Sequence, residues 1–210
     1  MVQSIPALKV KLSDLKDRFG LRWTEADDFF TDWLGNFPAL TAEEIKALDR
    51  VKANYRYLLE YPIMESIVKM VVLSPLLDIA GFYAPPYRVT GEADVKVSAV
   101  DESEVIQGRI DVLIIQEQLW VTVIEAKNLE FSLTKVIPQT LAYMLAQPQP
   151  IRPTFGMVTN GSEFLFLKML HGTSPQYGTS DVFSLRNRGN NLYPIVQILK
   201  HFGQLIAQGS

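Results

Sequence analysis

Two acidic residues and a lysine stand at the ends of two adjacent apolar segments. Asp111 precedes the β-branched run 112–115, and Glu125 and Lys127 follow the run 119–124. Two neighbouring carboxylates repel each other unless a cation lies between them, and their hard oxygen atoms suit Mg²⁺ or Mn²⁺. Such a metal polarises a phosphoryl oxygen and acidifies a bound water, while a lysine orients that water or offsets negative charge. The trio therefore indicates phosphodiester hydrolysis.

A β-hairpin is the element that must position these residues. The two apolar runs are separated by the polar residues 116–118, which predicts two antiparallel strands and a tight turn. Residues that face each other across a hairpin have a constant sum of numbers, and 111 + 125 = 236 is twice 118. The turn centre then falls at or beside Gln118, and the α-carbons of Asp111 and Glu125 are expected roughly 4.5–5.5 Å apart. Strand alternation places Lys127 on the face of Glu125.

Alternatively, the same three residues could form salt bridges at the end of a strand and have only a structural role. The tripeptide Glu-x-Lys carries little information alone, because Glu44-Ile45-Lys46 has the same form inside a predicted surface helix. The information comes from the context, namely the two strands and an aspartate at hairpin distance.

With that context, the chain resembles the PD-(D/E)XK nuclease superfamily. Asp111, the 14-residue gap, Glu125-Ala126-Lys127 and a following helix carry the resemblance, which covers about residues 62–170. Within the superfamily, the chain is most similar to the N-terminal nuclease domain of type I restriction enzyme motor subunits. Ile110 stands where the name-giving proline would precede Asp111.

The resemblance implies roles for further residues. It implies Asp111 and Glu125 as ligands of one or two Mg²⁺, for which Mn²⁺ can substitute, and the carbonyl of Ala126 as an added ligand. Lys127 would position the attacking water. Glu65 matches the acidic residue of the family's first core helix, as a further ligand. Gln139 and Tyr143 match a Gln-x-x-x-Tyr pattern and would contact the substrate or brace the site.

Structural alternatives remain open for three of these residues. Glu65 could instead form an ion pair with Lys69 one helical turn later. Gln139 and Tyr143 are four residues apart and share a helix face, so they could be ordinary helix residues.

The composition bounds the remaining possibilities. A chain of 210 residues with 48% hydrophobic and 20% charged residues is typical of a globular protein. The absence of cysteine excludes disulfides, a thiol nucleophile and cysteine-bound zinc. The two histidines, His171 and His201, have no companion acid nearby. A net charge of −3 argues against binding nucleic acid through broad positive charge, although the acidic site contributes to that total.

The chain is expected to be a soluble cytoplasmic protein with no membrane partner. Its N-terminus lacks a signal pattern, and the longest apolar stretch, 67–83, is broken by Lys69, Pro75 and Asp78. No G-x-x-x-x-G-K-[ST] motif occurs, so no nucleotide-driven motor is expected in these residues. The protein would act alone, as a homodimer, or with a separate specificity or motor subunit.

The predicted fold is an α/β restriction-endonuclease-like core with a mixed central sheet flanked by helices. Both faces of the central strands are apolar, so both are expected to be covered. Residues 1–60 are predicted to be an N-terminal helical layer packed on the core, and 61–210 the nuclease-like domain. Capping boxes are expected at Thr24 and Thr41. Further predicted elements are a helix over 63–73, a strand over 92–100, a helix over 139–147, a hairpin of 154–159 and 163–169, and a final helix over 193–207.

The function predicted from these features is a metal-dependent nuclease acting on DNA. One alternative is a non-catalytic nucleic-acid- or protein-binding module on the same fold. Another is a partner-docking protein that uses an aromatic cluster near the N-terminus, formed by Trp23, Phe29, Phe30, Trp33 and Phe37.

Overall fold

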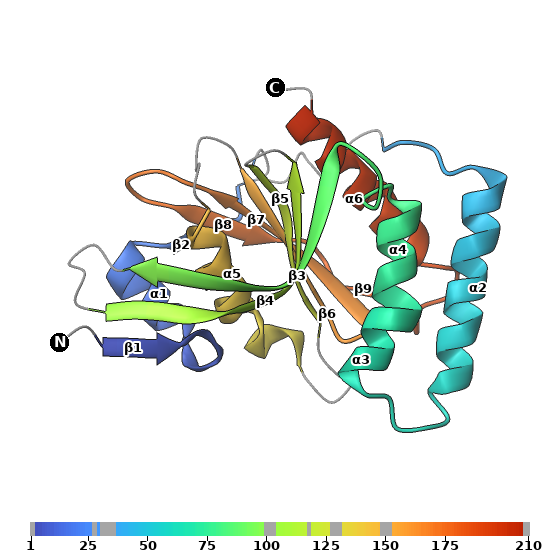
Figure 1. Cartoon of the computed structure of the whole chain (residues 1–210), viewed down its shortest axis with the longest axis horizontal. Helices are drawn as coiled ribbons and strands as arrows, with labels where there is room; N and C mark the ends of the chain where they lie inside the picture. The colour runs from blue at the N-terminus through green and yellow to red at the C-terminus, as the bar shows by residue number, and fades with distance from the viewer. Residues whose placement is uncertain are drawn as a thin grey trace.

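The structure, a computed structural model, describes residues 3–26, 29, 37–98, 104–116, 119–126, 132–147 and 153–207. Within these residues, one mixed β-sheet runs through the molecule (Figure 1). The strand order is β1-β4-β5-β6-β7-β8-β2, with β3 paired to β4 and β9 paired to β7. The strands are β1 (Gln3–Pro6), β2 (Arg22–Trp23), β3 (Tyr87–Ser98), β4 (Glu104–Gln116), β5 (Leu119–Ala126), β6 (Thr154–Thr159), β7 (Glu163–Leu170), β8 (Gln176–Thr179) and β9 (Phe183–Ser184).

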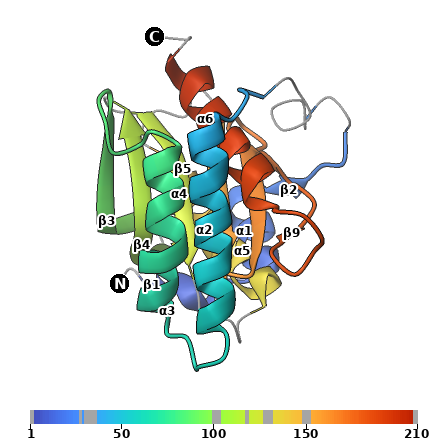
Figure 2. The same ribbon diagram turned by 90° about the vertical axis from the view of Figure 1, so that its right-hand side faces the viewer.

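Helices cover both faces of this sheet. Figures 1 and 2 show α2, α4 and α6 on one side, while α1 and α5 lie on the other. Each layer has its own buried apolar cluster, one built around Leu76, Phe155 and Phe202 and the other around Leu113 and Leu141. The prediction that both faces are covered is therefore confirmed. The helices are α1 (Leu12–Phe19), α2 (Ala42–Leu58), α3 (Glu65–Val68), a π-helical segment (Lys69–Leu73), α4 (Ser74–Ile79), α5 (Ile137–Leu145) and α6 (Leu192–Ala207).

The central hairpin has the predicted register. β4 and β5 are antiparallel, and the pairs Val112 with Ile124 and Leu113 with Val123 each sum to 236. A register shift follows between Ile114 and Ile115, and the connecting residues 117–118 lie outside the described part of the chain. β5 then pairs in parallel with β6, which requires a crossover, and α5 lies in that crossover.

Local signals account for several other elements. Thr41 caps α2: its hydroxyl accepts from the Glu44 N–H at 3.2 Å, and Glu44 Oε2 accepts from the Thr41 N–H at 2.8 Å. Pro138 lies in the first turn of α5, where its missing N–H is tolerated. The hairpin of β6 and β7 turns at Asn160 and Gly161, with Gly161 at a φ of 84°. The second capping box, at Thr24, involves residue 27, outside the described residues.

The N-terminal region differs from the predicted helical layer. Besides α1 and α2, it contains two short strands, since β1 pairs in parallel with β4 and β2 pairs in parallel with β8. These strands are too short for their alternation to be recognised, and their partners are at least 100 residues away in sequence. The division into domains at residues 1–60 and 61–210 stays a prediction.

Two of the three described members of the predicted aromatic cluster pack in the interior. Phe29 is buried and its carbonyl accepts a hydrogen bond from Lys168 Nζ at 3.0 Å. Phe37 packs against the core cluster that includes α6. Trp23 remains about half exposed and contacts Tyr177 edge to face. Phe30 and Trp33 lie outside the described residues. Among the helices that are described, none has the length and apolar character needed to cross a membrane.

Candidate functional site

Asp111 on β4 and Glu125 on β5 lie side by side in the structure. Val112 pairs with Ile124 in the ladder, and Asp111 and Glu125 are the adjacent residues at that end of the two strands. The register therefore places the two acidic residues opposite each other. Asp111 Oδ2 accepts a hydrogen bond from the Ala126 N–H at 2.9 Å, and Glu125 Oε1 accepts one from the Asp111 N–H at 3.4 Å. Each carboxylate therefore accepts a main-chain hydrogen bond from the opposite strand, Glu125 from Asp111 itself and Asp111 from Ala126, the residue after Glu125.

The Glu125 carboxylate is fully buried. Its exposed fraction is 0%, whereas the Asp111 side chain is 15% exposed. Ile124 and Ala126 point into the core cluster under α2, α4 and α6, so alternation turns Glu125 toward α5. Burying a carboxylate is costly unless hydrogen bonds or a cation compensate it. The residues around Glu125 must supply that compensation.

Gln139 on α5 supplies part of it, and Tyr143 on the same helix contacts Gln139. Gln139 Nε2 donates to Glu125 Oε2 at 3.2 Å and to the Tyr143 hydroxyl oxygen at 3.0 Å. The same hydroxyl oxygen accepts from the Arg109 N–H at 3.2 Å. Burial, together with the charge of Glu125, raises the pKa of Tyr143 to about 12, so the phenol stays neutral. The two residues therefore lie at the site, while their role in substrate contact or bracing stays a prediction.

Close packing at Gly108 allows this arrangement. A Cβ atom added at Gly108 would collide with the Tyr143 hydroxyl and would lie 2.8 Å from Ala7 Cβ. No side chain fits there without moving α5 or the segment that holds Ala7. Gly108 thus lets the hydroxyl approach the main chain of β4, where it meets the Arg109 N–H.

Lys69 joins the site from the opposite helical layer. Its Nζ lies 2.9 Å from Asp111 Oδ1 and 2.8 Å from Glu65 Oε1. Burial lowers the pKa of Lys69, but hydrogen bonds to Glu65 and Asp111 outweigh this effect, so its net pKa is raised. Of the two readings of Glu65, the ion pair with Lys69 is present. Glu65 as a metal ligand stays a prediction.

β3 is distorted beside Asp111. Gly91 pairs with Val112 and Ala93 with Ile110, which leaves Glu92 at the level of Asp111. Glu92 has a φ of 51°, a left-handed conformation that is uncommon for residues other than glycine. The ladder is interrupted at the level of the aspartate, where strain of this kind often marks a functional site.

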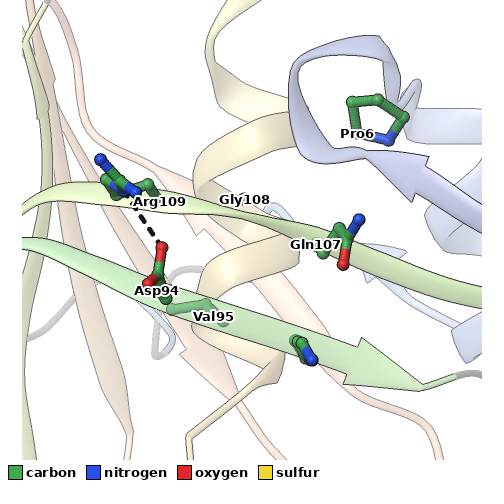
Figure 3. A pocket seen from close by; sticks show the side chains of 7 residues that line it. Pro6, Asp94, Val95, Gln107, Gly108 and Arg109 are labelled. Atoms are coloured by element: carbon green, nitrogen blue, oxygen red, sulfur yellow. Dashed lines mark hydrogen bonds and ion pairs between the residues drawn. The ribbon is translucent and has the colours of Figure 1, made fainter.

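A hollow of about 500 Å³ lies along the same strands (Figure 3). In Figure 3, Arg109 of β4 faces Asp94 of β3, and Nε of Arg109 lies 3.1 Å from Asp94 Oδ1. Arg109 Nη1 also lies 3.2 Å from Glu92 Oε2. The hydrogen bond to Asp94 and the charges of Asp94 and Glu92 raise the pKa of Arg109. Arg109 is therefore engaged with β3 and does not reach toward Glu125.

The remaining predicted site residues are placed only in part. Lys127 belongs to residues 127–131, which lie outside the described part of the chain. Ala126 ends β5 and its N–H contacts Asp111, while a role for its carbonyl stays a prediction. Sequence reasoning missed the contact between Lys69 and Asp111. The spacing of Glu65 and Lys69 was visible, but nothing local joins Lys69 to a strand 42 residues later.

The donor set fits a divalent cation. Among the described residues, no group of three or more histidine, cysteine, aspartate or glutamate side chains is arranged to hold a metal ion. Mg²⁺, however, is usually held by one or two carboxylates and keeps several waters. The ammonium of Lys69 in contact with Asp111 Oδ1 is an observed cation at this carboxylate. Asp111 and Glu125 are the two carboxylates that would hold Mg²⁺ or Mn²⁺ here, and the binding of a metal stays a prediction.

We expect Tyr143→Phe to destabilise the protein by about 1–3 kcal/mol, because the partly buried Arg109 N–H and the buried Gln139 amide would lose their shared acceptor. The free energy of unfolding can be measured by urea denaturation. Tyr57→Phe is the matched control, because Tyr57 is 63% exposed, and its effect should stay within about 0.5 kcal/mol. Equal stability of the wild type and Tyr143→Phe would contradict the bracing role.

Comparison with known proteins identifies the family of the chain. The family described as type I restriction enzyme R protein N terminus matches residues 37–174, which include every predicted site residue. A comparison with curated proteins gives no match. The matched region contains α2 to α5 and most of the sheet, in keeping with a restriction-endonuclease-like α/β fold. The chain belongs to the family of type I restriction enzyme R protein N-terminal domains.

Proposed function

We propose that the protein is a Mg²⁺-dependent nuclease that hydrolyses phosphodiester bonds in DNA. The observation that carries the proposal is the pairing of Asp111 with the fully buried Glu125 at adjacent strand positions. Membership of a restriction-enzyme family supports the interpretation of this pair as a nuclease site rather than an ordinary ion-pair network. Gln139, which donates to Glu125 from α5, and Tyr143, which accepts from Gln139, support the same proposal.

The proposed roles of Asp111, Glu125 and Gln139 rest on their contacts, and those of Lys127 and the Ala126 carbonyl rest on the resemblance to the nuclease superfamily. Asp111 and Glu125 would hold the metal, and the Ala126 carbonyl would add a ligand. Bound Mg²⁺ would polarise the phosphoryl oxygen and acidify a water. Lys127 would position the attacking water. Because Gln139 donates to Glu125 Oε2, it would keep this carboxylate in one orientation during the reaction.

DNA and further protein subunits are the proposed partners. The family name refers to one subunit of a multi-subunit restriction enzyme. The present sequence contains no phosphate-binding motif of the G-x-x-x-x-G-K-[ST] type. A nucleotide-driven motor, if the protein works with one, would come from outside these 210 residues.

A non-catalytic binding module on the same fold is the second candidate. The favouring observation is the bridge from Glu65 through Lys69 to Asp111, which neutralises Asp111 without a metal. In such a module the acidic pair would be purely structural, and its replacement would change stability without any catalytic consequence.

Asp111→Asn should reduce metal-dependent cleavage by at least about 100-fold, because the amide cannot replace a charged ligand. Purified protein can be tested on plasmid, linear and single-stranded DNA and on RNA, with Mg²⁺, Mn²⁺ or EDTA. Asp94→Asn is the matched control, since Asp94 is exposed and pairs with Arg109. Full activity of Asp111→Asn would rule out the proposed site.

Lys127→Ala should abolish cleavage while leaving Mn²⁺ binding intact, because the lysine acts on the water and not on the metal. Cleavage assays and calorimetric titration with Mn²⁺ separate the two effects. Lys135→Ala, at an exposed position after the site, is the control and should retain both properties. Undiminished cutting by Lys127→Ala would remove the lysine from the mechanism.

A further inference from the structure

Lys69 connects two carboxylates from different elements. Its Nζ contacts Glu65 Oε1 on the same helical segment and Asp111 Oδ1 on β4, at 2.8 and 2.9 Å. The Lys69 side chain is 29% exposed and the Asp111 side chain 15%, so water screens this contact only in part. The ammonium is therefore a substantial component of the electrostatic environment of Asp111.

The backbone that carries Lys69 is irregular. Lys69 opens a π-helical segment between α3 and α4, and the Ser74 N–H donates to the Lys69 carbonyl five residues earlier. Such segments are rare and occur frequently at functional sites. Val68 and Val72, on either side of Lys69, are fully buried. Because these neighbours anchor the backbone, a change in the position of the ammonium would come from the flexible side chain of the lysine.

The two oxygens of Asp111 have different partners. Oδ2 accepts the Ala126 N–H, whereas Oδ1 contacts Lys69. A metal shared by Asp111 and Glu125 would bring two positive charges close to the lysine ammonium. Like charges a few ångströms apart in a partly buried site repel strongly. The metal and the lysine would therefore compete for Asp111 Oδ1.

We propose that Lys69 is a positioning residue that holds Asp111 in the metal-free protein and leaves Oδ1 when a divalent cation binds. Glu65 is the anchor that keeps the displaced ammonium beside the site. Glu65 thus acts through Lys69 and not as a direct ligand. This inference rests on the proposed function, because it assumes that Asp111 and Glu125 bind a divalent cation.

The test is calorimetric titration of Mn²⁺ into the wild type and Lys69→Met. Removing the competing charge should tighten Mn²⁺ binding at least about fivefold. Thermal unfolding gives a second readout: Lys69→Met should melt at a lower temperature than the wild type without metal, and should gain more from added Mn²⁺. A purely structural lysine would lower the melting temperature without tightening the binding of Mn²⁺. Lys46→Met, at an exposed position of α2, controls for the change in net charge.

The outcomes separate this inference from the proposed function. Mn²⁺ binding by the wild type with equal or weaker binding by Lys69→Met would overturn the role of Lys69 alone. No Mn²⁺ binding by the wild type would overturn both proposals. Lys69→Gln is assayed in parallel as a second neutral variant. If both variants fold only in the presence of Mn²⁺, the proposed replacement of Lys69 by a cation at Asp111 Oδ1 is supported. If they fail to fold both with and without Mn²⁺, the proposal is contradicted.

Discussion

The burial of the Glu125 carboxylate beside Asp111 is the constraint on which the site depends. Two negative charges in a poorly hydrated environment are unfavourable unless each has donors or a cation close by. Main-chain N–H groups of the two strands, the Gln139 amide and the Lys69 ammonium meet this requirement. These donors come from both strands and from both helical layers, so the site depends on the packing of all four.

The fold places these donors by bringing both helical layers to the end of β5. α5 belongs to the layer on one face and presents Gln139, while the π-helical segment belongs to the other layer and presents Lys69. The left-handed residue Glu92 interrupts the pairing of β3 at the level of Asp111. Gly108 lets α5 approach β4 closely enough for the Tyr143 hydroxyl to contact the main chain. All of these structural features lie around the pair of Asp111 and Glu125.

The sequence predicts the geometry correctly where the regular spacing of residues along one hairpin or one helix determines it. The hairpin register of Asp111 and Glu125 follows from counting, and the helical spacing of Gln139 and Tyr143 correctly places both on one face of α5. Contacts that depend on packing between distant segments were not predictable in this way. The reach of Lys69 to β4, the pairing of β1 with β4 and the collision that excludes a side chain at Gly108 are of this second kind.

The most direct test of the metal site is the position of Mn²⁺ in crystals grown with excess MnCl₂, located by anomalous scattering of manganese. We expect a peak about 2 Å from carboxylate oxygens of both Asp111 and Glu125, with the ammonium of Lys69 moved away from Asp111 Oδ1. Crystals without a manganese peak at this pair, or with the metal bound only elsewhere, would contradict it.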